Sequence, residues 1–317
     1  MNILLYLVML LIFPGFLFVS LVGLLLSGFD RKVLARMQHR VGPPIVQPFY
    51  DFFKLAGKET IVPANANRKA YLAAPWIGLV SLVVLSLYIS VCGMGLWDEW
   101  GIFSGHADMI IVLYLLTIPG VCLIVAGSAS GSPYAGVGIS REMVTMISYE
   151  LPLIIVLLAV AKALGGDTLD FSIAGAASQP LISHLALIPA AIAFLLIIPA
   201  EVGTQPFDVA EAETEICEGA LVEYSGLPLG IFKMNTAIKM YIMSGLFICL
   251  FFGGLTTGIV ILDVVLFLLG CLVVTILTCT TIHAVTARLK IEHLFKFYWT
   301  IVAGLASVSL VLVWLGL

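Results

Sequence analysis

The sequence predicts an all-α, polytopic membrane protein of about eight transmembrane helices, and two observations lead to this fold class. Hydrophobic residues make up 61% of the 317 residues and charged residues only 11%, against roughly 25% in an average soluble domain. The apolar residues also gather in runs of about 20, the length that crosses a bilayer as a helix. We therefore expect a single membrane domain over residues 1–317.

The apolar runs set the expected spanning helices. They lie at residues 3–27, 71–95, 109–127, 146–163, 182–200, 238–256, 258–284 and 297–316. The first is expected to be a retained span, because residues 1–29 carry no basic segment of the kind that begins a signal peptide. Pro119, Pro152 and Pro189 are expected to interrupt the third, fourth and fifth helices.

The basic residues predict the orientation of the chain. Of the 15 Lys and Arg residues, only Lys162 falls on the side of the even-to-odd loops. Because cytoplasmic loops carry the excess of Lys and Arg, we expect a cell-membrane protein with both termini outside and its large loops cytoplasmic. The two long polar loops, residues 28–70 and 201–237, then face the cytoplasm, where such polar mass favours the docking of a partner.

The first long loop contains an expected interfacial helix. After Gly42, apolar residues including Phe49, Phe52 and Phe53 recur at helical spacing, with lysines on another face. Such a pattern is typical of a helix that lies in the membrane plane, and the alternative is a helix packed against another subunit. The candidates for contact with lipid headgroups or with a docked arm are Arg31, Arg36, Arg40, Lys54, Lys58, Arg141 and Arg288.

The second long loop is acidic and contains no Lys or Arg before Lys233. If this loop is helical, its carboxylates at 208, 211, 215 and 218 form one stripe, and like charges at that spacing repel one another. Crowding and desolvation raise carboxylate pKa values, and groups that titrate near pH 7 can pass protons along water. The loop therefore suggests either a proton relay or an acidic docking surface.

Carboxylates expected inside the membrane extend this acidic set, since burying one is costly and marks a functional candidate. A structural pair with a nearby Arg is the alternative for those of the fourth helix. The proton-relay candidates are Glu142, Glu150, Glu201, Asp208, Glu211, Glu213, Glu215, Glu218 and Glu223.

No catalytic or metal site is expected in this chain. The six cysteines show no C-x-x-C spacing, and the five histidines show no paired motif. Any redox cofactor should therefore belong to partner subunits, and this chain should be a non-catalytic subunit. The net charge of -4 does not suggest a nucleic-acid partner.

Four motifs follow one another along the chain. The first loop carries Asp30-Arg31-Lys32 and then Arg40-Val41-Gly42-Pro43-Pro44. The fourth helix carries Arg141-Glu142 and Ser148-Tyr149-Glu150-Leu151-Pro152. The acidic loop carries Pro206-Phe207-Asp208 and Glu223-Tyr224-Ser225-Gly226, and the last loop runs from Ala287-Arg288 to Lys296. Together these four motifs resemble subunit 1 of complex I.

Two departures make the chain more similar to one branch of that family. The first loop lacks the longer Gly-Pro-Asn-Arg-Val-Gly-Pro segment of respiratory members, and Thr204-Gln205 stands where they tend to have Asn-Arg. Both features resemble the membrane subunit of energy-converting group 4 [NiFe] hydrogenases. They also weaken the expectation of a quinone pocket.

The resemblance implies a set of partners. A hydrophilic [NiFe]-type large subunit and an iron–sulfur small subunit would dock on the cytoplasmic loops and take electrons from ferredoxin. The [NiFe] centre and iron–sulfur clusters would lie in those partners, with none in this chain. This subunit would anchor the arm in the lipid membrane and link proton reduction to H⁺ or Na⁺ translocation by antiporter-like membrane subunits.

Other functions stay open at this point. A complex I subunit 1 would help to form a quinone site, and equivalent subunits exist in sulfur-reducing and formate hydrogenlyase complexes. A stand-alone secondary transporter belongs to another class, and the absence of a visible inverted repeat argues against it.

Overall fold

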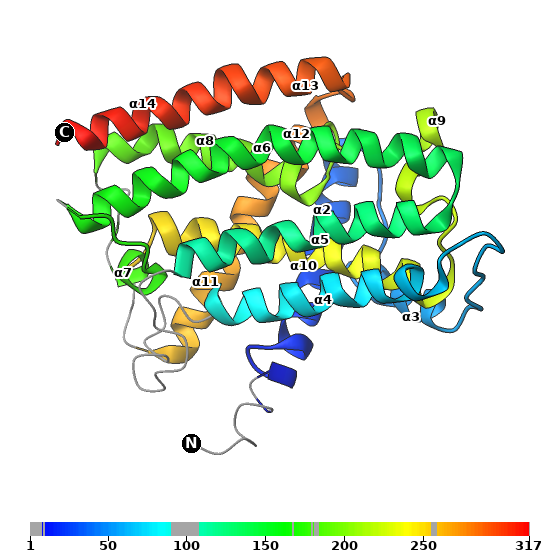
Figure 1. Ribbon diagram of the computed structural model, residues 1–317. Helices are drawn as coiled ribbons and strands as arrows, with labels where there is room; N and C mark the ends of the chain where they lie inside the picture. The colour runs from blue at the N-terminus through cyan, green and yellow to red at the C-terminus, as the bar shows by residue number, and fades with distance from the viewer. Residues whose placement is uncertain are drawn as a thin grey trace.

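A computed structural model describes residue 8 and residues 10–89, 108–166, 168–178, 180, 184–254 and 259–316. All regular elements in these ranges are helices, which confirms the predicted all-α class. Most of the long helices run side by side across the view in Figure 1, with α11 crossing them obliquely. The connections at residues 38–67 and 203–225 lie at one end of the bundle, which we name the loop end.

Seven helical segments in the described part of the chain are long and apolar enough to span a membrane, consistent with a multi-pass membrane protein. In chain order they are α4 (Arg68–Ile89), α5 (Asp108–Ser130), α6 (Pro133–Gly165), α8 (Ile188–Val202) preceded by one 3-10 turn, α10 (Gly226–Phe251), α11 with α12 (Val260–Thr275 and Thr281–Val285) and α13 with α14 (Ile291–Phe297 and Ala303–Trp314). A π-helical turn joins each of the last two pairs, at Ile276–Thr280 and Tyr298–Val302.

The helix α2 (Phe16–Met37) corresponds to the first predicted span but extends well beyond it. Its 22 residues run ten positions past residue 27, through Asp30, Arg31 and Lys32, so the charged motif continues the helix instead of starting a loop. Residues 3–7 and residue 9 of the predicted span lie outside the described residues.

Two other helices extend beyond the predicted apolar runs at their starts. The helix α6 starts at Pro133, 13 residues before the expected boundary, and α10 starts at Gly226, 12 residues before it. The predicted proline interruptions were wrong for α5 and α6, which continue through Pro119 and Pro152. Pro189 instead stands in the first turn of α8, where the missing N–H has no intrahelical partner to lose.

The core of the bundle is α10, nearly all of which is buried. It contacts α2, α3, α4, α8 and α11. Gly23 makes the close approach of α2 possible, because a Cβ there would lie 2.8 Å from the carbonyl oxygen of Ala237. By contrast, few residues of α11 and α14 are buried in the isolated chain, as expected for helices that face lipid or a neighbouring subunit.

Residues 203–225, which we name the acidic segment, fold over the loop end of α5 and α6. The rings of Tyr71 and Tyr224 stack with centroids 4.0 Å apart. The Tyr71 hydroxyl donates to the carbonyl of Glu223 at 2.7 Å, and the Tyr224 hydroxyl donates to the carbonyl of Tyr71 at 3.1 Å. These contacts fix the end of the acidic segment to the start of α4.

A glycine on α6 allows the acidic segment to pack closely, and it provides a first testable prediction. A Cβ at Gly138 would lie 2.6 Å from the backbone nitrogen of Ala220 and 2.9 Å from the Cα of Gly219. We expect Gly138→Ala to destabilise the chain by about 1–3 kcal/mol, because backbone must move. Gly136→Ala is the matched control, since nothing lies within 4 Å of its added Cβ.

The measurement is the temperature at which half of the protein leaves the soluble, detergent-purified state. Gly136→Ala should leave this temperature unchanged or raise it, because alanine favours helix. Equal midpoints for the two variants would show that close packing at Gly138 contributes nothing.

The predicted amphipathic helix is present as α3 (Gln47–Ala56). Phe52 packs against the core, whereas Tyr50 and Phe53 are 62% and 67% exposed. The helix lies against α2 and α10 of its own chain. The exposed Tyr50 and Phe53 are free to contact lipid or another subunit. That α3 lies in the membrane plane stays a prediction.

Candidate functional site

A polar cavity of ≈ 60 Å³ lies at the loop end, where α5, α6, α8 and α10 meet the acidic segment. Four of the predicted relay carboxylates line it: Glu142, Glu201, Asp208 and Glu211. Lys239, Asn235 and Thr236 of α10 line the same cavity. The fold therefore gathers groups from three separate parts of the sequence around a space that is roomy enough for water.

The least exposed charged groups of the cavity form an ion pair between α8 and α10. The Lys239 ammonium donates to Oε1 of Glu201 at 2.9 Å and to the Glu201 backbone carbonyl at 3.1 Å. The side chains are 10% and 3% exposed. Removing both charges from water is costly, and the close geometry with a second hydrogen bond offsets that cost.

The cavity also contains carboxylates without an ion-pair partner in the described residues. Glu142, from α6, and Glu211, from the acidic segment, both line it. Burial raises the pKa of Glu211 to about 7, and the nearby Glu142 and Glu218 carboxylates add to this rise. Glu211 can therefore gain or lose a proton close to neutral pH.

Two buried polar atoms beside the cavity point to water. Oδ1 of Asn235 and Oε1 of Glu150 are buried and have no hydrogen-bond partner among the described residues. Glu150 lies two turns further along α6 than Glu142 and is within electrostatic reach of Glu201 and Lys239. Since buried polar groups are normally satisfied by protein or ordered water, these atoms mark positions for water molecules that would join the carboxylates.

Asp208 closes the cavity through a forked ion pair. Arg288, just after α12, donates from Nη2 to Oδ2 at 2.7 Å and from Nε to both carboxylate oxygens at 3.1 and 3.2 Å. The Asp208 side chain is 12% exposed. Through this pair, Asp208 holds the acidic segment against the connection between α12 and α13.

Glu215 is held in a similar way but at the surface. Its Oε2 accepts from Arg141 of α6 at 2.6 Å, and Arg141 also donates to the carbonyl of Val209 at 3.3 Å. The Glu215 side chain is 55% exposed. An exposed pair of this kind contributes little stability, so its main effect is to orient the acidic segment.

The predicted acidic stripe on one helix was wrong. The acidic segment contains only two short helical turns, α9 (Glu213–Ile216) and a 3-10 turn at Gly219–Leu221, and otherwise consists of turns and irregular chain. Glu218 has a φ of +69° and Gly219 a φ of +54°, so the chain reverses where a helix would continue. The carboxylates at 208, 211, 215 and 218 therefore do not share one helical face.

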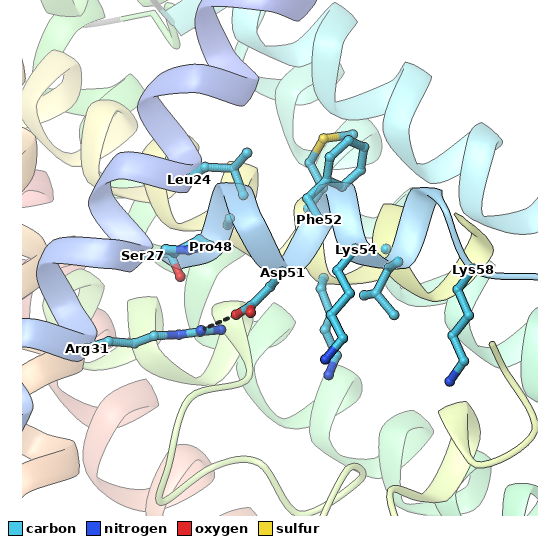
Figure 2. A pocket seen from close by; sticks show the side chains of 13 residues that line it. Leu24, Ser27, Arg31, Pro48, Asp51, Phe52, Lys54 and Lys58 are labelled. Carbon is cyan, nitrogen blue, oxygen red and sulfur yellow. Dashed lines mark hydrogen bonds and ion pairs between the residues drawn. The ribbon is translucent and has the colours of Figure 1, made fainter. Parts of the chain in front are cut away.

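The remaining predicted residues lie outside this cavity. Glu223 is exposed, and the side chain of Glu213 lies outside the described residues. Arg36 and Arg40 are exposed at the end of α2 and just after it. Arg31, Lys54 and Lys58 line a second cavity, of ≈ 290 Å³, between α2, α3 and α10 (Figure 2).

The ion pair of Lys239 with Glu201 was not predicted from the sequence. There, Lys239 was counted only among the basic residues that set the orientation of the chain. The available signal was a lone lysine with six apolar residues among its eight nearest neighbours in the chain, Ile238 and Met240 included. Such a lysine is expected to pair with a carboxylate. Within the described part of the chain, no cluster of His, Cys, Asp and Glu has the arrangement of a metal site.

The comparisons with known proteins identify the relatives of this chain. Residues 8–314 match the family described as NADH dehydrogenase. "Hydrogenase-4 component C" of Escherichia coli (strain K12) is 35% identical over 230 residues, which are 72% of this chain and 70% of the relative. A subunit of the NADH-quinone oxidoreductase of Thermomicrobium roseum is 36% identical over 260 residues, 74% of this chain and 75% of the relative.

A solved structure agrees with these sequence matches. A chain from the structure of the membrane-bound sulfane sulfur reductase, described as an archaeal respiratory membrane complex, superposes with a TM-score of 0.80 at 28% identity. The match covers 93% of this chain and 96% of that chain. This chain therefore belongs to the NADH dehydrogenase family, the family of complex I subunit 1, and is a membrane subunit of a complex I-like complex.

Proposed function

We propose that this chain is the membrane-anchor and coupling subunit of an energy-converting [NiFe] hydrogenase complex. In this account a peripheral arm takes electrons from ferredoxin and reduces protons. The chain anchors that arm at its loop end, and it passes a proton or a charge change to antiporter-like subunits that move H⁺ or Na⁺. The iron–sulfur clusters and the [NiFe] centre belong to the hydrophilic partners.

The observation that carries the proposal is the polar cavity with its four carboxylates and one lysine. A subunit that only anchored an arm would not need a buried Glu201–Lys239 pair beside the unpaired Glu142 and Glu211. Buried charges are costly and are kept where they act. The similarity to component C of hydrogenase-4 supports the hydrogenase branch.

The cavity supports a path for protons between the loop end and the membrane interior. Glu211 belongs to the acidic segment, Glu142 and Glu201 stand on membrane helices, and Glu150 lies deeper on α6. A proton taken up at Glu211 can pass through water to Glu142 and on toward Glu150. Lys239 would respond by strengthening or weakening its bond to Glu201, which couples the charge of the cavity to the packing of α8 against α10.

Asp208 and Glu215 have a different role in this proposal. Both carboxylates are bound by arginines, so they would hold the acidic segment in place and would not carry protons themselves. A partner that docks on residues 203–225 would change these ion pairs first. The acidic segment would then be both the docking surface and the place where protons enter the relay.

A sulfur-reducing complex is the second candidate, because the superposed chain comes from a membrane-bound sulfane sulfur reductase. The relay described above would serve either complex. The two candidates differ in the metal content of the partner arm.

The pKa of Glu211 leads to a second prediction, which tests the relay. We expect Glu211→Gln to lower ion translocation per electron transferred and to flatten its pH dependence between about pH 6 and 8. At a pKa of about 7, roughly half of the chains carry the proton at neutral pH. Glutamine stays neutral at every pH, like the protonated form of Glu211, so the variant cannot switch between the two forms.

The same shift has a consequence for stability. The folded-state pKa of about 7 lies above the ordinary value of 4.5. The folded chain therefore keeps a proton that the unfolded chain releases over this interval. The free energy of unfolding that protonated Glu211 contributes is therefore fully present below about pH 4.5. It decreases as the pH rises toward 7.

The measurement uses the whole complex in proteoliposomes, with ion uptake and ferredoxin oxidation followed together. Glu292→Gln is the matched control, because Glu292 is exposed and does not line the polar cavity. Unchanged coupling and an unchanged pH profile in Glu211→Gln would contradict the relay and leave only docking.

A further inference from the structure

The second cavity combines an apolar wall with a cluster of cations. It measures ≈ 290 Å³ and lies between α2, α3 and α10. Leu24, Phe52, Leu55 and Met234 form part of its apolar wall. Figure 2 shows Lys54, on α3, and Lys58, two residues after its end, extending in the same direction, with Arg31 reaching across from α2 to Asp51.

The charges around this cavity do not balance. Arg31, Lys54, Lys58 and Lys233 line it, against the single carboxylate of Asp51. Asp51 is already bound by Arg31 at 2.9 Å and by the amide of Gln47 at 3.0 Å. In the described part of the chain, none of the three lysines lies within ion-pair distance of a carboxylate. The cavity therefore favours a ligand group with negative charge.

An apolar strip leads out of the cavity along α2. Leu17, Leu21 and Leu24 are spaced four and three residues apart, so they share one face of the helix. Leu24 lines the cavity, whereas Leu17 and Leu21 are 55% and 44% exposed. Ser27 and Arg31 continue the same face toward the loop end. The face thus passes from apolar to cationic over about four turns.

This polarity matches a lipid better than a wholly polar or a wholly apolar ligand. A volume of ≈ 290 Å³ is at the lower limit of pockets that hold drug-sized ligands, roughly 300–1,000 Å³. The cavity can therefore take a headgroup but not acyl chains. Acyl chains would lie outside it, along the exposed leucines of α2.

We propose that the cavity between α2, α3 and α10 binds one anionic phospholipid. Its phosphate would accept hydrogen bonds from Lys54, Lys58 and Lys233, and an acyl chain would cover Leu21 and Leu17. The lipid would fill the space between α3 and α2 and so hold α3 in place at the membrane surface. This site does not use the carboxylates of the relay.

The experiment measures the lipid that stays with the purified complex. The complex is reconstituted in nanodiscs of phosphatidylglycerol or of phosphatidylcholine, then returned to detergent, and the lipid retained per complex is measured by native mass spectrometry. Lys54→Gln with Lys58→Gln removes two of the cations. Lys69→Gln with Lys290→Gln is the matched control, since both lysines are exposed and lie outside the cavity.

We expect the wild-type complex to retain phosphatidylglycerol and not phosphatidylcholine. Affinity should fall by about fivefold for each cavity lysine removed and should not change in the control pair. Ser27→Leu, which fills the cavity without changing its charge, should also reduce retention and provides a second variant with an intact α3.

Three results would overturn the proposal. One is an equal loss of lipid in the control pair, which would indicate a general effect of surface charge. Another is the retention of a neutral isoprenoid quinone in place of the anionic lipid. The third is displacement of the lipid by inorganic phosphate alone at similar concentration, which would show that the apolar strip contributes nothing.

Discussion

Replacing Lys239 by methionine is expected to destabilise the chain by about 3–5 kcal/mol, the range measured when a buried ion pair loses one partner. The substitution leaves Glu201, whose side chain is 3% exposed, without its cation. It also removes the hydrogen bond to the Glu201 backbone carbonyl. Glu201 would then be a buried carboxylate without a cation beside it, which is costly, and the polar cavity would change.

The double variant Glu201→Gln with Lys239→Met separates charge from packing. Because both charges are removed together, most of the lost stability should return. The measurement is the temperature at which half of the chain dissociates from the purified complex. A double variant as unstable as Lys239→Met alone would show that the shape of lysine, and not its charge, supports the interface of α8 and α10.

The second large effect is expected at Arg288. Arg288→Gln should cost about 1.5–3 kcal/mol, the usual range for hydrogen bonds to charged groups. The Asp208 side chain is 12% exposed and accepts three hydrogen bonds from this guanidinium. Arg288→Lys should recover only part of the loss, because an ammonium cannot reproduce the forked geometry.

Loss of the Arg288–Asp208 pair should also release the acidic segment from the connection between α12 and α13. We expect faster proteolysis within residues 203–225 of Arg288→Gln, together with weaker binding of the hydrophilic arm. Arg36→Gln is the control, since Arg36 is exposed and forms no ion pair among the described residues. Equal protease resistance in the two variants would contradict an anchoring role for Arg288.

The positions of the spanning helices could be predicted from hydropathy, but their ends at the loop end could not. The helices α6 and α10 both start with Gly and Pro residues that lower local hydropathy. These residues nevertheless stay helical because they pack against other helices and the acidic segment. Hydropathy reports transfer into lipid, so it cannot detect helix that is buried inside protein.

The shape of the acidic segment could not be predicted from helical spacing, for a physical reason. Its carboxylates are held by Arg288 and Arg141, which lie far away in the sequence. Gly219 has a positive φ there, and a Cβ at this position would lie 2.1 Å from the carbonyl oxygen of Ala210, so both features require glycine. Pro206 and Gly219 were visible in the sequence as helix breakers; their partners were not.

The sequence named relay carboxylates but not their arrangement, and their role in proton transfer stays a prediction. Glu142, Glu201, Asp208 and Glu211 were named from charge alone, and the fold places all four around one cavity. Charge alone could not separate them into paired and unpaired groups, because this depends on the folding of α10 beside α8. Lys239 became part of the site only through that packing.

The most direct test of the central claim is purification of the intact complex in mild detergent through this chain, with nickel, iron and flavin measured on the product. The account predicts co-purified hydrophilic subunits that contain nickel and iron without flavin. Iron without nickel would favour a sulfur-reducing relative, and iron with flavin a respiratory one; either would contradict the hydrogenase assignment. A homogeneous, active preparation of this chain without metal would contradict the coupling-subunit account altogether.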